Sequence, residues 1–181
     1  MRFEWVSHDL NGVFQVSSLH GNKLFACGYL DNSLRVFDLE QKPGHHQVAV
    51  LQGQHAARIS CIKFSSDYRY LFSCDADGVI LHYGLKSKQQ QVVDGKKDAF
   101  PYRLLHKLQD QMDEILAIDT NQTLDMYVTF SRDGTLAVRC QRTSKLWYQF
   151  KIFSKVEMKK TGQQQKQDVL VIGFSKTFKA I

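Results

Sequence analysis

The chain has 181 residues, of which 43% are hydrophobic and 12% aromatic, and only two are proline. This composition excludes extended disorder, and a chain of this length buries about 70% of its unfolded surface when it folds. No run of about 18 apolar residues is present, so no membrane-spanning helix is predicted. Four cysteines without a C-x-x-C pair, and a Met1-Arg2-Phe3-Glu4 start without an apolar signal segment, favour reduced thiols and a cytoplasmic location.

Charge divides the chain into two parts. Residues 1–138 hold 14 basic and 16 acidic residues, whereas residues 139–181 hold ten basic and two acidic residues, a net charge of +8. Because charge runs usually lie on a solvated surface, Lys151–Lys166 is interpreted as a connector between strands. The alternative is that the segment attracts nucleic acid or an anionic membrane surface by counterion release.

Three hairpin turns are predicted along the chain, at Asp31-Asn32, Asp77-Gly78 and Asp133-Gly134. Asp-Gly, and less strongly Asp-Asn, adopts the positive φ angles of a two-residue type I′ turn. The three segments align without a gap over 25 positions, and four columns of that alignment are apolar in every copy. These columns are Val13/Ile59/Ile115, Val16/Ile62/Ile118, Phe25/Leu71/Tyr127 and Leu34/Ile80/Leu136.

The spacing between the turns is 46 and then 56 residues, against roughly 40–45 for a β-propeller blade. The polar, aperiodic stretch Lys86–Lys97 accounts for part of the excess as an inserted surface loop. Short strands are predicted at Lys23–Cys27, Leu34–Phe37, Gln47–Leu51, Ser60–Phe64, Tyr70–Cys74, Val79–Tyr83 and Leu146–Ile152. Several are apolar at successive positions and need cover on both faces, which stacked blades supply.

The predicted fold is therefore all-β: a single domain, residues 1–181, made of about three propeller blades plus part of a fourth. The blade-like repeats cover residues 9–51, 55–108 and 111–152, and residues 153–181 form the partial blade. Such an incomplete propeller leaves apolar blade faces that need cover. Further blades of a longer chain, or a second copy, are the expected cover.

A buried polar relay is predicted in the second repeat, linking His55, Ser73, Asp77 and Tyr83. An unpaired buried polar group costs about 1–3 kcal/mol, so these groups are expected to satisfy one another. The role is structural, because a mid-strand Ser73 lacks the oxyanion hole and strained elbow that nucleophilic catalysis requires. The other repeats are degenerate, with Cys27 and Phe37 in the first and Asp110-Gln111, Thr129 and Arg139 in the third.

Other constellations do not predict chemistry. His45-His46 lacks further ligands at metal spacing, and no phosphate-binding loop or zinc motif is present, so no metal and no cofactor are expected. Trp147, Tyr148 and Phe150, near Arg142 and Lys145, resemble an aromatic and basic mixture for single-stranded nucleic acid. The alternation in Leu146–Ile152 favours a blade strand instead.

Together, the repeats resemble WD40 repeats, and two stretches are more particular. Leu30-Asp31-Asn32-Ser33-Leu34-Arg35-Val36 is similar to the Trp-Asp-Asn-Ser-Ile-Arg-Val stretch of BEACH-domain (neurobeachin-like) proteins, with Leu30 in place of Trp. Leu124–Val128 followed by Ser131–Thr135 resembles a later blade of that family. The resemblance implies the propeller of large scaffolds in vesicle trafficking and autophagy. No PH-like or BEACH segment is present in these 181 residues.

The predicted function is a non-enzymatic protein-interaction scaffold, cytoplasmic or peripheral to endomembranes, with any membrane association indirect. Protein partners are expected and nucleic acid is disfavoured. Because exposed Arg and Tyr are enriched at interface anchors, the candidate partner-binding residues are those that flank the hairpins and strand ends: Arg58, Tyr68, Arg69, Arg132 and Arg142. The alternative function is an anionic binder acting through the basic C-terminal segment.

Overall fold

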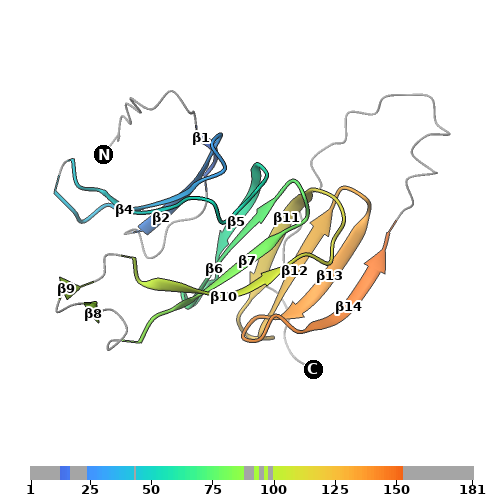
Figure 1. Ribbon diagram of the computed structural model, residues 1–181. Coiled ribbons are helices and arrows are strands. Elements are labelled where there is room, and N and C mark those ends of the chain that lie inside the picture. Colours follow the sequence, from blue (N-terminus) through green and yellow to red (C-terminus); the bar gives the residue numbers. More distant parts are fainter. Residues whose placement is uncertain are drawn as a thin grey trace, which may run out of the picture.

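The computed structural model is all-β in the residues that it describes, which are 13–16, 24–42, 44–87, 92–93, 96–97 and 100–152. The predicted partial blade, residues 153–181, lies outside the described residues. Three four-stranded antiparallel sheets stand side by side, coloured blue, green and orange in Figure 1. The prediction of an all-β fold of propeller blades is confirmed.

Each sheet lies within one predicted repeat and is a four-stranded meander. Sheet 1 consists of β1 (Val13–Val16), β2 (Leu24–Tyr29), β3 (Leu34–Asp38) and β4 (Gln47–Leu51). Sheet 2 consists of β5 (Ile59–Phe64), β6 (Tyr70–Asp75), β7 (Ile80–Leu85) and β10 (Tyr102–Leu108). Sheet 3 consists of β11 (Ile115–Asn121), β12 (Met126–Ser131), β13 (Thr135–Cys140) and β14 (Leu146–Lys151). Two short strands, β8 (Val92–Val93) and β9 (Lys96–Lys97), pair within the predicted surface loop.

The three sheets share two β-bulges at equivalent positions. The first and second strands shift register at Val13/Gln15, Ile59/Cys61 and Ile115/Ala117. The third and fourth strands shift register at Val36/Phe37, Leu104/His106 and Val138/Arg139. A bulge inserts an extra residue and increases local twist. The gap-free alignment of the sequence therefore extends to the details of the backbone.

The predicted turns are hairpins, but their type is not I′. Asn32, Gly78 and Gly134 have φ angles of 62°, 80° and 85°, whereas φ is negative at the Asp before each of them. Each positive-φ N–H donates to the carbonyl three residues earlier, at Tyr29, Asp75 and Ser131. This is a type I turn followed by one left-handed residue, a three-residue loop. The Asp stands at the third position of the type I turn, where φ is about −90°.

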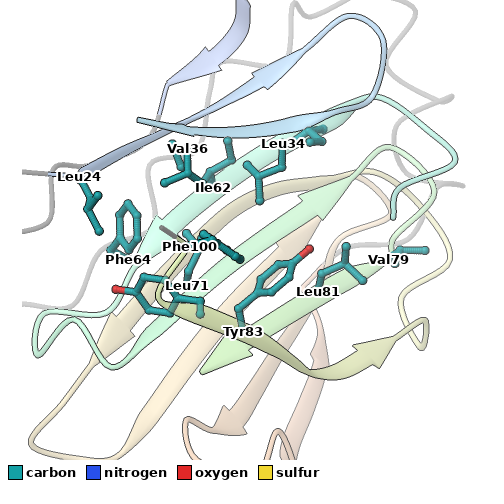
Figure 2. Packing of buried hydrophobic residues seen from close by; sticks show 13 residues of the cluster. Leu24, Leu34, Val36, Ile62, Phe64, Leu71, Val79, Leu81, Tyr83 and Phe100 are labelled. Carbon is teal, nitrogen blue, oxygen red and sulfur yellow. The ribbon is translucent and has the colours of Figure 1, made fainter. Parts of the chain in front are cut away.

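Apolar side chains fill the spaces between the sheets. The cluster between sheets 1 and 2 contains 13 buried residues, among them Leu34 and Val36 of β3, which lie opposite side chains of sheet 2 in Figure 2. Its other members are Leu24, Ala26, Ile59, Ile62, Phe64, Leu71, Val79, Leu81, Tyr83, Phe100 and Tyr102. The smaller cluster between sheets 2 and 3 contains Cys61, Phe72, Cys74, Ile80, Ile115, Ile118 and Tyr127. Strands that are apolar on successive positions are thus covered on both faces.

The four cysteines are free thiols and all are buried. Burial raises the pKa of Cys27 to about 11 and that of Cys61 to about 12. Their protonated thiols are core groups and poor nucleophiles. Within the described part of the chain, no helix is long and apolar enough to cross a membrane.

Candidate interaction surface and its supporting relays

The buried relay of sheet 2 centres on His55. Its Nε2 lies 2.7 Å from the Ser73 hydroxyl and its Nδ1 lies 2.8 Å from a carboxylate oxygen of Asp75. The predicted partner, Asp77, is exposed in the middle of the turn. The relay prediction is therefore wrong in its acid, because Asp75 ends β6 with its side chain inside the sheet whereas Asp77 points to solvent.

Asp75 also closes the turn. Its second carboxylate oxygen accepts hydrogen bonds from the N–H groups of Asp77 and Val79, at 3.0 and 2.9 Å. The side chains of His55 and Asp75 are both fully buried, as is Ser73. A serine that is buried in mid-strand offers no access to a substrate, so the geometry fits a structural link and not a hydrolase triad.

Tyr83 occupies the fourth predicted relay position. Burial raises the pKa of Tyr83 to about 12, with the nearby Ser73 hydroxyl opposing that rise. No hydrogen bond of ordinary geometry reaches its hydroxyl in the described structure. Its ring packs in the cluster between sheets 1 and 2. Tyr83 therefore contributes packing to the end of the relay.

Sheet 3 keeps a relay with different side chains. Gln111 stands where the second repeat has His55, and its amide links the Thr129 hydroxyl (2.6 Å) to the carbonyl of Thr135 (3.1 Å). Asp133 accepts hydrogen bonds from the Ser131 hydroxyl and from the N–H and hydroxyl of Thr135. The repeat that was interpreted as degenerate thus forms an equivalent link with an amide in place of an imidazole.

A buried arginine takes the place of Tyr83 in sheet 3. Arg139 is 1% exposed and donates from Nη2 to Asp110 at 2.5 Å. A buried charge needs such a partner, because desolvation otherwise costs several kcal/mol. Asp110, directly before Gln111, therefore joins the loop that precedes β11 to the end of β13.

Asp31 plays the turn role in sheet 1. It accepts hydrogen bonds from the N–H and hydroxyl of Ser33, and its second oxygen accepts from Arg35 at 2.9 Å. Partial burial by itself raises the pKa of Asp31. These hydrogen bonds and the charge of Arg35 outweigh it and hold that pKa below its usual value. The turn Asp and a hydroxyl two residues later recur in sheets 1 and 3. In sheet 2 that hydroxyl is replaced by Val79, and Asp75 supplies the bonds instead.

The turns and relay loops of neighbouring sheets meet at one end of the molecule, which we call the relay end: residues 30–33, 55–58, 76–79, 111–114 and 132–134. The Asn32 amide donates to the carbonyl of Ala56 at 3.0 Å. A Cβ at Gly78 would lie 2.0 Å from the carbonyl oxygen of Gln111. Gly78 is therefore required both by its φ angle and by close contact with the next sheet.

Two predicted partner-binding residues, Arg58 and Arg132, come together at the relay end. Both guanidinium groups pair with Glu114, whose side chain is 6% exposed, and the Arg58 contact is 2.6 Å. Their own side chains remain 36% and 46% exposed. Arg58 therefore joins sheet 2 to sheet 3, Arg132 holds Glu114 from within sheet 3, and both arginines present positive charge to solvent.

The other three predicted residues lie at the opposite end of the sheets, which we call the hairpin end: residues 65–69, 122–125 and 141–145. Tyr68 has a φ of 61° and its carbonyl accepts a hydrogen bond from Tyr102 at 2.7 Å. Arg69 and Arg142 are 74% and 72% exposed, and Arg142 pairs with Asp125 at 2.6 Å. The predicted set is thus divided between two surfaces.

A further polar contact between sheets 2 and 3 was not predicted. His82 of β7 lies 2.8 Å through Nδ1 from the Ser144 hydroxyl, which also accepts from the Tyr127 hydroxyl at 3.2 Å. Burial, assisted by the nearby His106, lowers the pKa of His82 to about 3. The imidazole ring stacks on Phe72 at 4.7 Å. The sequence signal was weak, because Ser144 sits in an ordinary polar loop.

Residues 45–83 match the family model of the WD domain, G-beta repeat. The chain therefore contains a WD40 repeat. Similar solved structures include Sqt1 of Saccharomyces cerevisiae, with 17% identity, a TM-score of 0.64 and coverage of 82% of this chain and 38% of that chain. Comparison with curated protein sequences gives no match.

Two more solved structures are similar. One is a chain of the Mitotic Checkpoint Complex, with 15% identity, a TM-score of 0.59 and coverage of 77% of this chain and 39% of that chain. The other is U3-55K, with 13% identity, a TM-score of 0.62 and coverage of 80% and 40%. At such identities the likeness shows the fold alone: an incomplete WD40 β-propeller that spans about two fifths of the length of these chains.

Proposed function

We propose that this chain is a non-enzymatic protein-interaction scaffold whose two sheet ends bind protein partners. The observation that carries the proposal is that its polar groups fall into two sets, one buried inside a sheet and one exposed at the sheet ends. The relay groups His55, Ser73 and Asp75 are buried and hydrogen-bonded to one another. Exposed arginines, in contrast, stand at the ends of rigid sheets, where binding residues usually lie.

The finer proposal is a role in a BEACH-like scaffold of vesicle trafficking or autophagy, in the cytoplasm or at the periphery of endomembranes. It rests on the two sequence stretches that resemble that family. The first spans the turn at Asp31 and β3, and the second spans the turn before β12 and the turn at Asp133. A test is proximity labelling of the chain in cells, for which enrichment of endomembrane coat or autophagy proteins supports the role and a purely nuclear set contradicts it.

The partner-binding residues are tested in two groups. Arg69→Glu with Arg142→Glu alters the hairpin end, and Arg132→Gln alters the relay end while leaving Arg58 on Glu114. Arg103, exposed on β10 beside the hairpin end but outside the predicted set, gives the control Arg103→Glu. Partner capture is measured by quantitative mass spectrometry of the immobilised full chain. If neither end variant reduces capture more than the control does, the proposed residues are wrong.

The alternative function is binding of nucleic acid or an anionic membrane through residues 139–181. Within the described part of this segment, three of four basic side chains already pair with carboxylates: Arg139 with Asp110, Arg142 with Asp125 and Lys151 with Asp133. These pairs weigh against it. The alternative predicts an affinity that falls steeply between 50 and 200 mM salt, and a flat response excludes it.

We also propose that sheet 3 receives a further blade of the same longer chain. On β12 and β13, Val128, Phe130, Leu136 and Val138 occupy the columns of Phe72, Cys74, Ile80 and His82, which pack on sheet 3. Because the register is the same, the same apolar cover is expected. Reading the transcript beyond this segment tests it, since a stop without further repeats leaves only a second copy as cover.

A further inference from the structure

The outer strand of sheet 3 presents an open backbone edge. β14 is the last strand of its sheet and, among the described residues, pairs on one side only. The Ile152 N–H donates to the Gly134 carbonyl at 2.8 Å, and the pairing continues with Phe150 opposite Leu136. In an antiparallel ladder, alternate residues direct their peptide groups to the same neighbour. Phe150 and Tyr148 therefore bond to β13, whereas the peptide groups of Gln149 and Lys151 point away from the sheet.

The side chains of this strand are exposed as well. All six residues of β14 are exposed, whereas β4 and β10, the outer strands of the other sheets, are partly buried against the sheet that follows each of them. Tyr148 and Phe150 are 63% and 54% exposed and their rings stack at 6.2 Å. Trp147, at the bulge, and Ile152 extend the apolar surface. A long apolar edge strand is a template for pairing with another strand.

The charge around β14 selects among the possible partners. Lys145 is exposed at one end of β14, and Lys151 at the other end is 58% exposed although it pairs with Asp133 at 3.7 Å. The sequence has no further acidic residue between Asp133 and Glu157. A second copy brings another strand of the same sign, with a net charge of +8 over residues 139–181. Like charges on adjacent strands are destabilising, so an acidic partner is favoured.

Building on the proposed scaffold function, we propose that β14 binds an extended peptide of alternating acidic and apolar residues as a fifth strand of sheet 3. The open peptide groups of Gln149 and Lys151 bond to the peptide backbone. Apolar peptide side chains lie beside Tyr148 and Phe150 on one face, and acidic side chains lie near Lys151 on the other. This is strand addition, in which the backbone supplies affinity and alternate side chains supply specificity.

The test uses the full chain and an eight-residue fluorescent peptide in which glutamate alternates with valine or phenylalanine. A peptide of the same composition with its glutamates in one block is the matched probe, and a version with N-methyl groups on alternate peptide nitrogens removes the backbone donors. Binding is measured by fluorescence anisotropy. We expect the alternating peptide to bind at least about tenfold more tightly than either control, because each control loses several strand contacts.

Two variants place the site on β14. Gln149→Pro removes an N–H that points away from β13, so the sheet is retained while peptide affinity falls about tenfold. Phe150→Ser removes an exposed ring and is expected to weaken binding severalfold. Leu104→Ser, on the outer strand of sheet 2 and 42% exposed, is the matched control and leaves binding unchanged. Thermal unfolding of each variant checks that the fold is kept.

Three results overturn the inference: equal binding of the block peptide, indifference to both β14 variants, or a dimer in sedimentation that Gln149→Pro dissolves. Tighter binding of oligothymidylate than of the peptide, lost at 200 mM salt, assigns the strand to nucleic acid instead. The proposed scaffold function is judged separately by the arginine variants at the two sheet ends. If those variants reduce partner capture while the peptide fails to bind, only the β14 inference falls.

Discussion

The two spaces between neighbouring sheets are built alike in backbone and differently in chemistry. Between sheets 1 and 2, 13 buried side chains form one apolar cluster. Between sheets 2 and 3 the apolar cluster is smaller, and polar contacts cross the space: Arg58 on Glu114, Lys63 on Asp119 at 3.0 Å, Ser60 on the Ile115 carbonyl at 2.6 Å, and Ser144 on His82. The same register of strands and bulges is therefore compatible with an apolar contact between sheets and with one that includes polar pairs.

This contrast predicts that the two spaces respond to different perturbations. The first depends on apolar volume and is nearly indifferent to pH and salt. The second contains titratable groups and ion pairs, so it responds to both. The following variants test the contrast.

Loss of apolar volume between sheets 1 and 2 is expected to have the largest effect. Leu34 is fully buried there, so Leu34→Ala lowers the free energy of unfolding by about 3 kcal/mol through lost burial and a cavity. Leu124→Ala, at a side chain that is 44% exposed, changes it by less than about 0.5 kcal/mol. Urea unfolding measures both, and equal effects contradict the assigned core.

The relay is tested by replacing Asp75 and its neighbour Asp77, each in turn, by alanine. Asp75→Ala leaves His55 and two turn N–H groups without their hydrogen-bond partner. The free energy of unfolding is therefore expected to fall by about 2–3 kcal/mol. Asp77→Ala removes an exposed carboxylate and costs less than about 0.5 kcal/mol. A relay through Asp77 requires the reverse order, which the same unfolding experiment detects.

Acid sensitivity is expected from the space between sheets 2 and 3. The pKa of His82 is about 3 in the fold, against about 6.5 in an unfolded chain. Below pH 6.5 the unfolded chain binds a proton that the fold excludes, so His82 lowers stability by about 1.4 kcal/mol per pH unit between pH 6 and 4. His82→Phe should flatten that part of the stability profile. An unchanged slope in this variant shows that other groups cause the acid sensitivity.

The smallest effect is expected at the hairpin end. Arg142 pairs with Asp125 but is 72% exposed, and exposed ion pairs contribute about 0–1 kcal/mol. Arg142→Ala should leave the unfolding temperature nearly unchanged, and 0.5 M salt should remove any small difference. A larger loss, measured by thermal unfolding, assigns Arg142 to the core of the fold and not to a binding surface.

Much of the fold was predictable because the repeat is encoded locally. Hairpin turns need residues such as Asn32, Gly78 and Gly134 that tolerate positive φ, and strands need apolar residues at fixed distances from them. These requirements are visible in a single sequence. The turn type was less accessible, because Asp-Gly fits both a type I′ turn and a type I turn with one left-handed residue.

The strands and the three aligned repeats follow from the sequence alone, since they depend on neighbours within about 25 positions. Which polar groups meet depends on how the sheets fold and stack. Asp75 and Asp77 are two residues apart, and burial inside sheet 2 selected the first as the partner of His55. Likewise, Glu114 meets Arg58, and Ser144 meets His82, because contacts across stacked sheets join residues far apart in the chain.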